Sequence, residues 1–170
     1  MAVDGWTRYL LQEKIFSIGE DFWIENERGE QVYKVDGAAF SLRNSFVLQD
    51  AAGNELLSGA SKLLSFQPTV NLERQGQPYA TISKRLFTFL HQAYDITLAS
   101  GGAFEADGDI TNHEYTVTGS AGQVAQISRA WFSIRDSYGV AVAPGADVPL
   151  LLASAVCIEE ISERERERNR

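Results

Sequence analysis

The chain alternates between short runs of apolar or β-branched residues and polar turns that contain glycine. Four segments share one design, in which a strand-like run, a glycine-centred turn and a second strand-like run follow one another. These segments are DFWIENERGEQVYKV, SFVLQDAAGNELLSG, TVNLERQGQPYATIS and EYTVTGSAGQVAQIS. Their turn glycines are Gly29, Gly53, Gly76 and Gly122, and Gly101 and Gly102 mark a fifth turn. The spacing of about 23 residues predicts one β-hairpin per repeat.

The last apolar segment follows a different pattern. Residues 148–158, VPLLLASAVCI, carry no charge, and their apolar side chains point in every direction if the segment is helical. A helix that is apolar on all sides is normally buried on all sides. Asp147 is a favourable N-cap, and Pro149 is tolerated in a first turn. We therefore predict a buried core helix with these packing residues: Leu150, Leu151, Leu152, Val156, Cys157 and Ile158.

A meander of hairpins exposes its edge strands to other chains unless the sheet closes. Closing the sheet into a barrel removes both edges and leaves room for a helix along the axis. The pattern therefore predicts a mainly β fold, namely a closed antiparallel barrel built from hairpins that encloses the hydrophobic C-terminal helix. We expect a single domain over residues 1–162.

Residues 163–170 form a charged tail after this domain. Alternating charges at helical spacing predict ion pairs on a frayed, solvated extension of the helix. The predicted pairs are Glu160 with Arg164, Glu163 with Arg166, and Glu165 with Arg168.

Composition narrows the possible roles. The formal net charge of −8 argues against general nucleic-acid binding and against polybasic adhesion to membranes. A single cysteine, Cys157, excludes a disulfide within one chain and fits a reduced, cytoplasmic thiol. The N-terminus lacks the pattern of a signal peptide. The apolar C-terminal run is shorter than the roughly 20 residues that a spanning helix needs, so we expect a cytoplasmic protein without a transmembrane span.

Several short stretches resemble one known family. They are VYKVDG (Val32 to Gly37), FSLR (Phe40 to Arg43), ADGDITNHEY (Ala106 to Tyr115) and RDSYGV (Arg135 to Val140). In this order, and with the closing apolar helix, they resemble the LURP-one-related family. That family is part of the tubby C-terminal-like superfamily, which also includes the phospholipid scramblases. The resemblance runs from about Tyr9 to Ile158.

The resemblance implies a tubby-like barrel of about twelve strands around a hydrophobic C-terminal helix. It implies less about activity, because the LURP-one-related family is largely without an assigned biochemical function. Tubby domains bind phosphoinositides, and scramblases are linked to lipid movement and calcium. Within this superfamily an anionic phospholipid is therefore the natural ligand to expect.

Cations recur at one position of the hairpin unit. Lys62, Lys84 and Arg129 follow the similar endings GAS, TIS and QIS, and Arg85 follows Lys84. If the units are equivalent, these side chains gather near one rim of the barrel, where they can hold a phosphate or carboxylate. The alternative is that they are ordinary solvated strand ends or edge-protecting cations. We predict a non-enzymatic binding or scaffolding module, with a protein–protein interaction module as the alternative.

One segment contains residues suited to metal chemistry. In EADGDITNHEY, Asp107, Asp109 and His113 are candidate ligands of a metal-dependent hydrolase. The simpler interpretation is a turn at Asp107–Gly108 between two strands. The sequence contains no nucleophile elbow, phosphate-binding loop or dinucleotide fingerprint. We therefore expect no cofactor and no catalytic residue, with the hydrolase as a second alternative.

Overall fold

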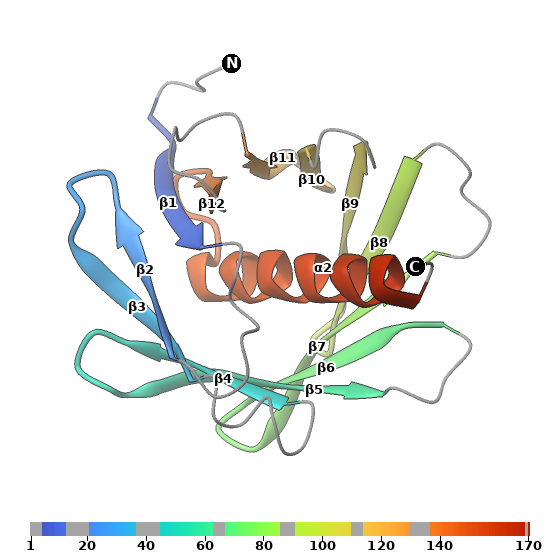
Figure 1. Cartoon of the computed structure of the whole chain (residues 1–170), viewed down its shortest axis with the longest axis horizontal. Helices are drawn as coiled ribbons and strands as arrows, with labels where there is room; N and C mark the ends of the chain where they lie inside the picture. The colour runs from blue at the N-terminus through green and yellow to red at the C-terminus, as the bar shows by residue number, and fades with distance from the viewer. Residues whose placement is uncertain are drawn as a thin grey trace.

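The computed structural model describes residues 5–12, 21–36, 45–62, 67–85, 91–109, 114–129, 137–168 and 170. In these ranges, twelve strands form a closed antiparallel barrel around one helix (Figure 1). The strands are β1 (Thr7–Gln12), β2 (Phe22–Asn26), β3 (Gln31–Asp36), β4 (Ser45–Asp50), β5 (Glu55–Lys62), β6 (Thr69–Arg74), β7 (Gln77–Lys84), β8 (His91–Leu98), β9 (Ala103–Asp109), β10 (Glu114–Gly119), β11 (Gly122–Ser128) and β12 (Ser137–Val142). The helix is α2 (Val148–Arg168). The predicted fold class is confirmed.

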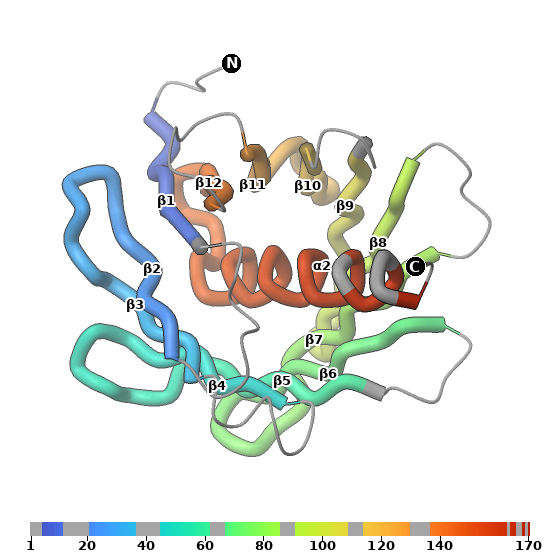
Figure 2. The backbone as a smooth tube through the Cα atoms, in the orientation of Figure 1, coloured from blue at the N-terminus to red at the C-terminus, as the bar shows by residue number. Residues whose placement is uncertain are grey.

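The first and last strands close the barrel. Each strand pairs with its neighbours in the chain, and β1 also pairs with β12, where Thr7 lies opposite Val142. Figure 2 shows β1 and β12 side by side, with the other strands arranged around α2. Because all neighbours are antiparallel, the odd-numbered strands run in one direction and end at one rim. This rim, where β5, β7 and β11 end, is termed the exit rim.

The predicted hairpin turns lie at the opposite end of the barrel. They connect β2 to β3, β4 to β5, β6 to β7, β8 to β9 and β10 to β11, and every turn glycine named above has a positive φ. The turn at Gly53, with φ of 89°, is also held by a side chain. Asp50 Oδ1 accepts hydrogen bonds from the amides of Ala52 and Asn54, each at 2.9 Å. Local turn chemistry therefore places the hairpins correctly.

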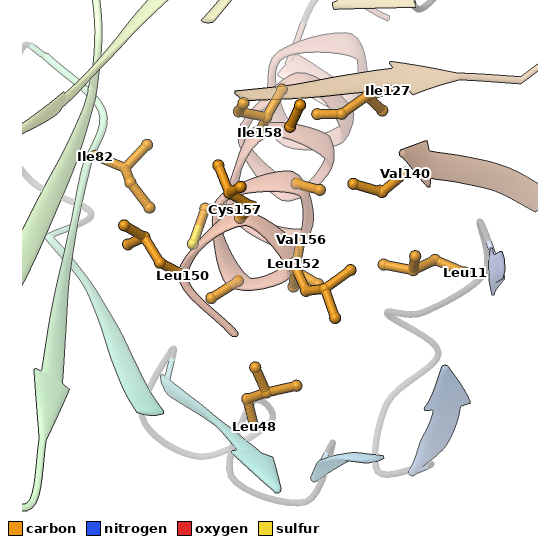
Figure 3. Packing of buried hydrophobic residues seen from close by; sticks show 14 of the residues in the cluster. Leu11, Leu48, Ile82, Ile127, Val140, Leu150, Leu152, Val156, Cys157 and Ile158 are labelled. Atoms are coloured by element: carbon orange, nitrogen blue, oxygen red, sulfur yellow. The ribbon is translucent and has the colours of Figure 1, made fainter. Parts of the chain in front are cut away.

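The interior is filled by α2. Alternate strand residues point inward, and Figure 3 shows wall side chains such as Leu11, Leu48 and Ile127 facing the helix. The predicted core-helix residues are all confirmed as buried, with exposed fractions of 3 % or less: Leu150, Leu151, Leu152, Val156, Cys157 and Ile158. The helix and the inward-facing residues of all twelve described strands form one buried hydrophobic cluster. No helix in the described part of the chain is long and apolar enough to cross a bilayer.

The N-terminus of α2 is fixed to the β6–β7 hairpin. Asp147 caps the helix, because its Oδ1 accepts a hydrogen bond from the Leu150 amide at 3.2 Å. The same carboxylate accepts a hydrogen bond from the Tyr79 hydroxyl and lies 3.5 Å from the Arg74 guanidinium. That guanidinium lies over the Tyr79 ring, 4.0 Å from its centroid. The predicted N-cap therefore also sets the position of the helix within the barrel.

At its C-terminal end α2 continues beyond residue 162 into the predicted tail and reaches Arg168. The predicted pair between Glu160 and Arg164 is confirmed. Glu165, which we expected to pair with Arg168, contacts Lys84 of β7. The side chains of the third predicted pair, Glu163 with Arg166, lie outside the described residues.

The turn predicted at Asp107–Gly108 is wrong. Both residues lie inside β9 and pair with β10, where Gly108 is opposite Tyr115. A Cβ atom on Gly108 would lie 2.2 Å from Cδ1 of the Tyr115 ring and 2.4 Å from the Glu114 carbonyl oxygen. The glycine is therefore required by the close approach of a neighbouring strand, which the local sequence does not reveal.

Candidate anion-binding site

Lys84 is the last inward-facing residue of β7. Ala80 and Ile82 are buried on the inner face of this strand, and the alternation of side chains places Lys84 on the same face. The Lys84 side chain is 12 % exposed and forms an ion pair with Glu165 of α2. Its backbone amide donates to the Pro68 carbonyl at 3.0 Å, which fixes the end of the strand. Lys84 is thus a largely buried cation at the exit rim.

Hydroxyl and amide groups line the inner face beside Lys84. Tyr94 of β8 lies directly opposite Lys84 in the strand pairing, and its hydroxyl is 3.1 Å from Ser162 Oγ of α2. Gln92 Oε1 accepts hydrogen bonds from Ser162 Oγ at 3.2 Å and from the Tyr115 hydroxyl at 2.8 Å. In Figure 1 the C-terminal end of α2 lies beside β8. This set, termed the inner-rim cluster, is Lys84, Gln92, Tyr94, Tyr115, Ser162 and Glu165.

The cluster contains donors that suit an oxyanion. Burial raises the pKa of Tyr94, and the neighbouring Tyr115 and the Glu165 carboxylate raise it further. The Tyr94 phenol therefore stays protonated and keeps a hydrogen-bond donor. An ammonium group and hydroxyl donors on one face bind phosphate or carboxylate oxygens by charge-assisted hydrogen bonds. In this structure the Glu165 carboxylate takes that position beside Lys84.

Arg85 lies on the other face of the barrel wall. Its Nε atom lies 3.1 Å and 3.0 Å from the two carboxylate oxygens of Asp95, and its Nη2 atom lies 2.8 Å from Glu105 Oε2. Asp95 and Glu105 are opposite each other in the pairing of β8 with β9, and both alternate with inward-facing residues. The side chains of Lys84 and Arg85 therefore lie on opposite faces of the barrel wall, so they do not form one site.

The other two predicted cations lie at the same rim. Lys62 ends β5, and its side chain is outside the described residues. Arg129 follows the end of β11 and is half-buried, with its Nε atom covered. The direction of the odd-numbered strands thus brings all four predicted cations to the exit rim. Of these four, Lys84 is the one that the described contacts place in the inner-rim cluster.

Another carboxyl group near the C-terminal end of α2 is buried. Glu160 is 3 % exposed, and its Oε1 atom accepts a hydrogen bond from the Arg164 guanidinium. Its Oε2 atom has no hydrogen-bond partner among the described residues. Burial raises the pKa of Glu160 to about 7, although the Arg164 charge acts in the opposite direction. Glu160 precedes Ser162 by two residues, which puts it on the opposite side of the helix from the inner-rim cluster.

The candidate hydrolase residues are only partly described. Asp107 is exposed on the outer face of β9, because its neighbour Ala106 is buried on the inner face. The Asp109 side chain and all of His113 lie outside the described residues. Among the residues that the structure covers, no group of three or more His, Cys, Asp or Glu is placed to hold a metal ion. A hydrolase that uses these residues stays a prediction.

Comparison with known proteins places the chain in a family. The family model described as LURP-one-related matches residues 7–159. The chain belongs to the LURP-one-related family. It is 29 % identical over 151 residues to the uncharacterized protein YxjI of Bacillus subtilis, a match that covers 89 % of this chain and 91 % of that protein. The crystal structure of an Arabidopsis thaliana protein superposes with a TM-score of 0.65 at 20 % identity, over 93 % of this chain and 91 % of that one. The structural likeness supports the fold and leaves the ligand open.

In this LURP-one-related protein, Lys84 was named as a candidate from the sequence, but the polar groups around it were not. On β8, Gln92 and Tyr94 occupy the inward positions nearest the exit rim, and buried Ile96 follows. This change from polar to apolar residues along one face of β8 was a sequence signal that could have predicted a polar cluster at the rim. Nothing comparable marks Ser162, because its contact with β8 depends on how α2 is rotated within the barrel.

Proposed function

We propose that this LURP-one-related protein is a non-enzymatic binding module that takes an anionic group at the inner-rim cluster. The group is the phosphate of a lipid headgroup or of a soluble ligand. The observation that carries the proposal is a largely buried ammonium, that of Lys84, on the inner face of the barrel. Tyr94 is the residue opposite Lys84 in the strand pairing, and its hydroxyl contacts Ser162. An ammonium group beside hydroxyl groups favours a charged oxygen ligand, because hydrogen bonds to ionised oxygens are stronger than those between neutral groups.

Three further observations support a binding role in the cytoplasm over catalysis. Leu152, Val156 and Ile158 of α2 occupy the barrel axis, so the space in which a barrel enzyme holds its substrate is filled by side chains. Besides the Glu165 carboxylate, the inner-rim cluster contains one cation and several hydrogen-bond donors, which suits recognition of an anion that replaces this carboxylate. Cys157 is a buried free thiol, which is typical of a reducing compartment.

Vesicle flotation at low salt tests the proposal, because exposed electrostatic contacts are least screened there. We expect the chain to float with phosphatidylcholine vesicles that contain phosphatidylinositol bisphosphate and to stay behind with phosphatidylcholine alone. Lys84→Gln should weaken this binding about tenfold, because a hydrogen bond to a charged group is lost. Calorimetry with soluble inositol trisphosphate then shows whether the headgroup alone suffices or a lipid surface is required.

Arg85→Gln is the matched control. It removes the same charge from the adjacent residue at the same rim, but on the outer face of the barrel. Binding should therefore keep its native strength in Arg85→Gln and be weakened about tenfold in Lys84→Gln. Equal loss in both variants would point to diffuse surface charge, and no binding of either phosphate probe would refute the proposal. In the latter case a protein partner becomes the favoured role.

A further inference from the structure

The Lys84 ammonium already has a counter-ion from its own chain. Glu165 lies in the last turn of α2, and its carboxylate contacts Lys84 on the inner face of the barrel. The side chain of Glu165 is 26 % exposed, so the pair lies at the boundary between the interior and water. An external anion that binds Lys84 needs the position that Glu165 now occupies. The carboxylate is therefore an internal competitor for the same cation.

The last turn of α2 can move away from the barrel at a low cost in free energy. The helix is buried up to Ser162, whereas Arg168 is exposed. Every residue after Ile161 is polar, so unwinding residues 165–168 exposes no apolar side chain of the helix and leaves Arg164 bonded to Glu160. The last carbonyl groups of any helix lack partners within it, which makes this turn the first to open. The apolar part of α2 stays in the barrel when the turn opens.

The counter-ions of Arg85 cannot leave in this way. Asp95 and Glu105 lie within β8 and β9 and are held by the pairing of these strands on both sides. The backbone of either residue cannot move away from Arg85 without a break in the barrel wall. Among the cation–carboxylate contacts described at the exit rim, the pair of Lys84 with Glu165 therefore combines a buried cation with a removable carboxylate.

We infer that the last turn of α2 is a releasable cover, in which Glu165 occupies the anion position at Lys84 until a phosphate group displaces it. This inference rests on the proposed function, because it concerns access to the same cluster. Opening withdraws Glu165 and leaves Lys84, Tyr94 and Ser162 available to the incoming phosphate. Binding affinity then depends on the ligand and on the strength of the contact that closes the cover.

The cover is tested first without any ligand, by the chemical reactivity of Lys84. Acetylation of lysines with an activated ester is followed by mass spectrometry for the native chain, Glu165→Gln and Glu55→Gln. The Glu55 variant makes the same charge change at an exposed position at the opposite end of the barrel. Lys84 should react several-fold faster in Glu165→Gln and at the native rate in Glu55→Gln, with Lys34 as the internal reference. Unchanged labelling of Lys84 in Glu165→Gln would overturn the cover.

Binding of the same phosphate probes then separates the cover from the proposed function. With phosphatidylinositol bisphosphate vesicles, Glu165→Gln should bind about fivefold more tightly than the native chain, since a partly exposed ion pair no longer competes. Glu55→Gln should match the native chain, and Lys84→Gln should remove the gain. Equal affinity of Glu165→Gln and the native chain, with binding still dependent on Lys84, would overturn the cover alone. No binding by either would overturn the proposed function itself.

A point substitution is preferred to removal of residues 163–170. Truncation also deletes Arg164, whose guanidinium donates a hydrogen bond to the buried Glu160. A loss of folding would then be confused with an effect on the cover. Thermal melts of Glu165→Gln and the native chain should agree closely, which confirms that both are folded under the labelling conditions.

Discussion

Replacing Glu160 with glutamine should stabilise the protein at neutral and alkaline pH. The Glu160 carboxyl is buried on α2, and one of its oxygens has no hydrogen-bond partner among the described residues. Burial opposes the charged form and raises its pKa from 4.5 to about 7. Glutamine has nearly the same shape, stays neutral at every pH and can still accept the hydrogen bond from Arg164.

The expected size follows from the two pKa values of Glu160. Between pH 4.5 and about 7 the folded state binds more protons at this site than the unfolded state, so stability falls as the pH rises. Since each tenfold change in proton affinity is worth about 1.4 kcal/mol, the charged carboxylate destabilises the fold by up to about 3 kcal/mol above this range. Glu160→Gln should recover up to about 3 kcal/mol at about pH 8 and almost nothing at about pH 4.

Urea unfolding followed by circular dichroism at both pH values measures this difference. Glu55→Gln serves as the control, because it makes the same chemical change at an exposed residue, the first of β5. Its unfolding curve should follow the native chain at both pH values. If Glu160→Gln is less stable than the native chain at the higher pH, or if its gain does not depend on pH, the interpretation of Glu160 as a destabilising buried charge is wrong.

Three other changes test the core and its attachments. Gly59→Ala places a Cβ atom 2.3 Å from Phe46 Cε1, so we expect a loss of about 1–3 kcal/mol in thermal unfolding that Phe46→Leu partly restores; full native stability of the single variant would contradict this packing. Tyr79→Phe removes the hydrogen bond to the Asp147 carboxylate and should cost about 1.5–3 kcal/mol by urea unfolding, whereas an unchanged midpoint would show that this bond does not hold α2. Cys157 is fully buried and burial raises the pKa of its thiol, so a thiol reagent should modify it only after denaturation. Rapid modification of the folded protein would show that α2 leaves the barrel.

The fold was predictable because its main signals are local. A glycine with positive φ specifies a hairpin turn through its own backbone, as at Gly53, and the uncharged run of α2 specifies burial from composition alone. The capping role of Asp147 likewise follows from its place just before the helix. Each of these features depends on residues only a few positions apart.

The site was less predictable because its contacts join distant segments. Lys84 was named as a candidate, but its partner Glu165 is 81 residues away and faces it only because of how α2 is rotated in the barrel. Arg85 was grouped with Lys84 by adjacency, although neighbouring strand residues point to opposite faces. Gly108 could not be explained from the local sequence for the same reason. The position must be glycine because Tyr115 on the next strand leaves no room for a Cβ atom.

The order of elements along the chain has a consequence for biosynthesis. All twelve described strands leave the ribosome before α2, and β1 cannot pair with β12 until the segment around Val142 has been made. For most of its translation, the growing chain therefore exposes the apolar side chains that line the inside of the finished barrel. Pairing between such distant segments is intrinsically slow and leaves intermediates that aggregate readily. We expect the nascent chain to depend on a chaperone that binds exposed apolar strands until α2 has been synthesised.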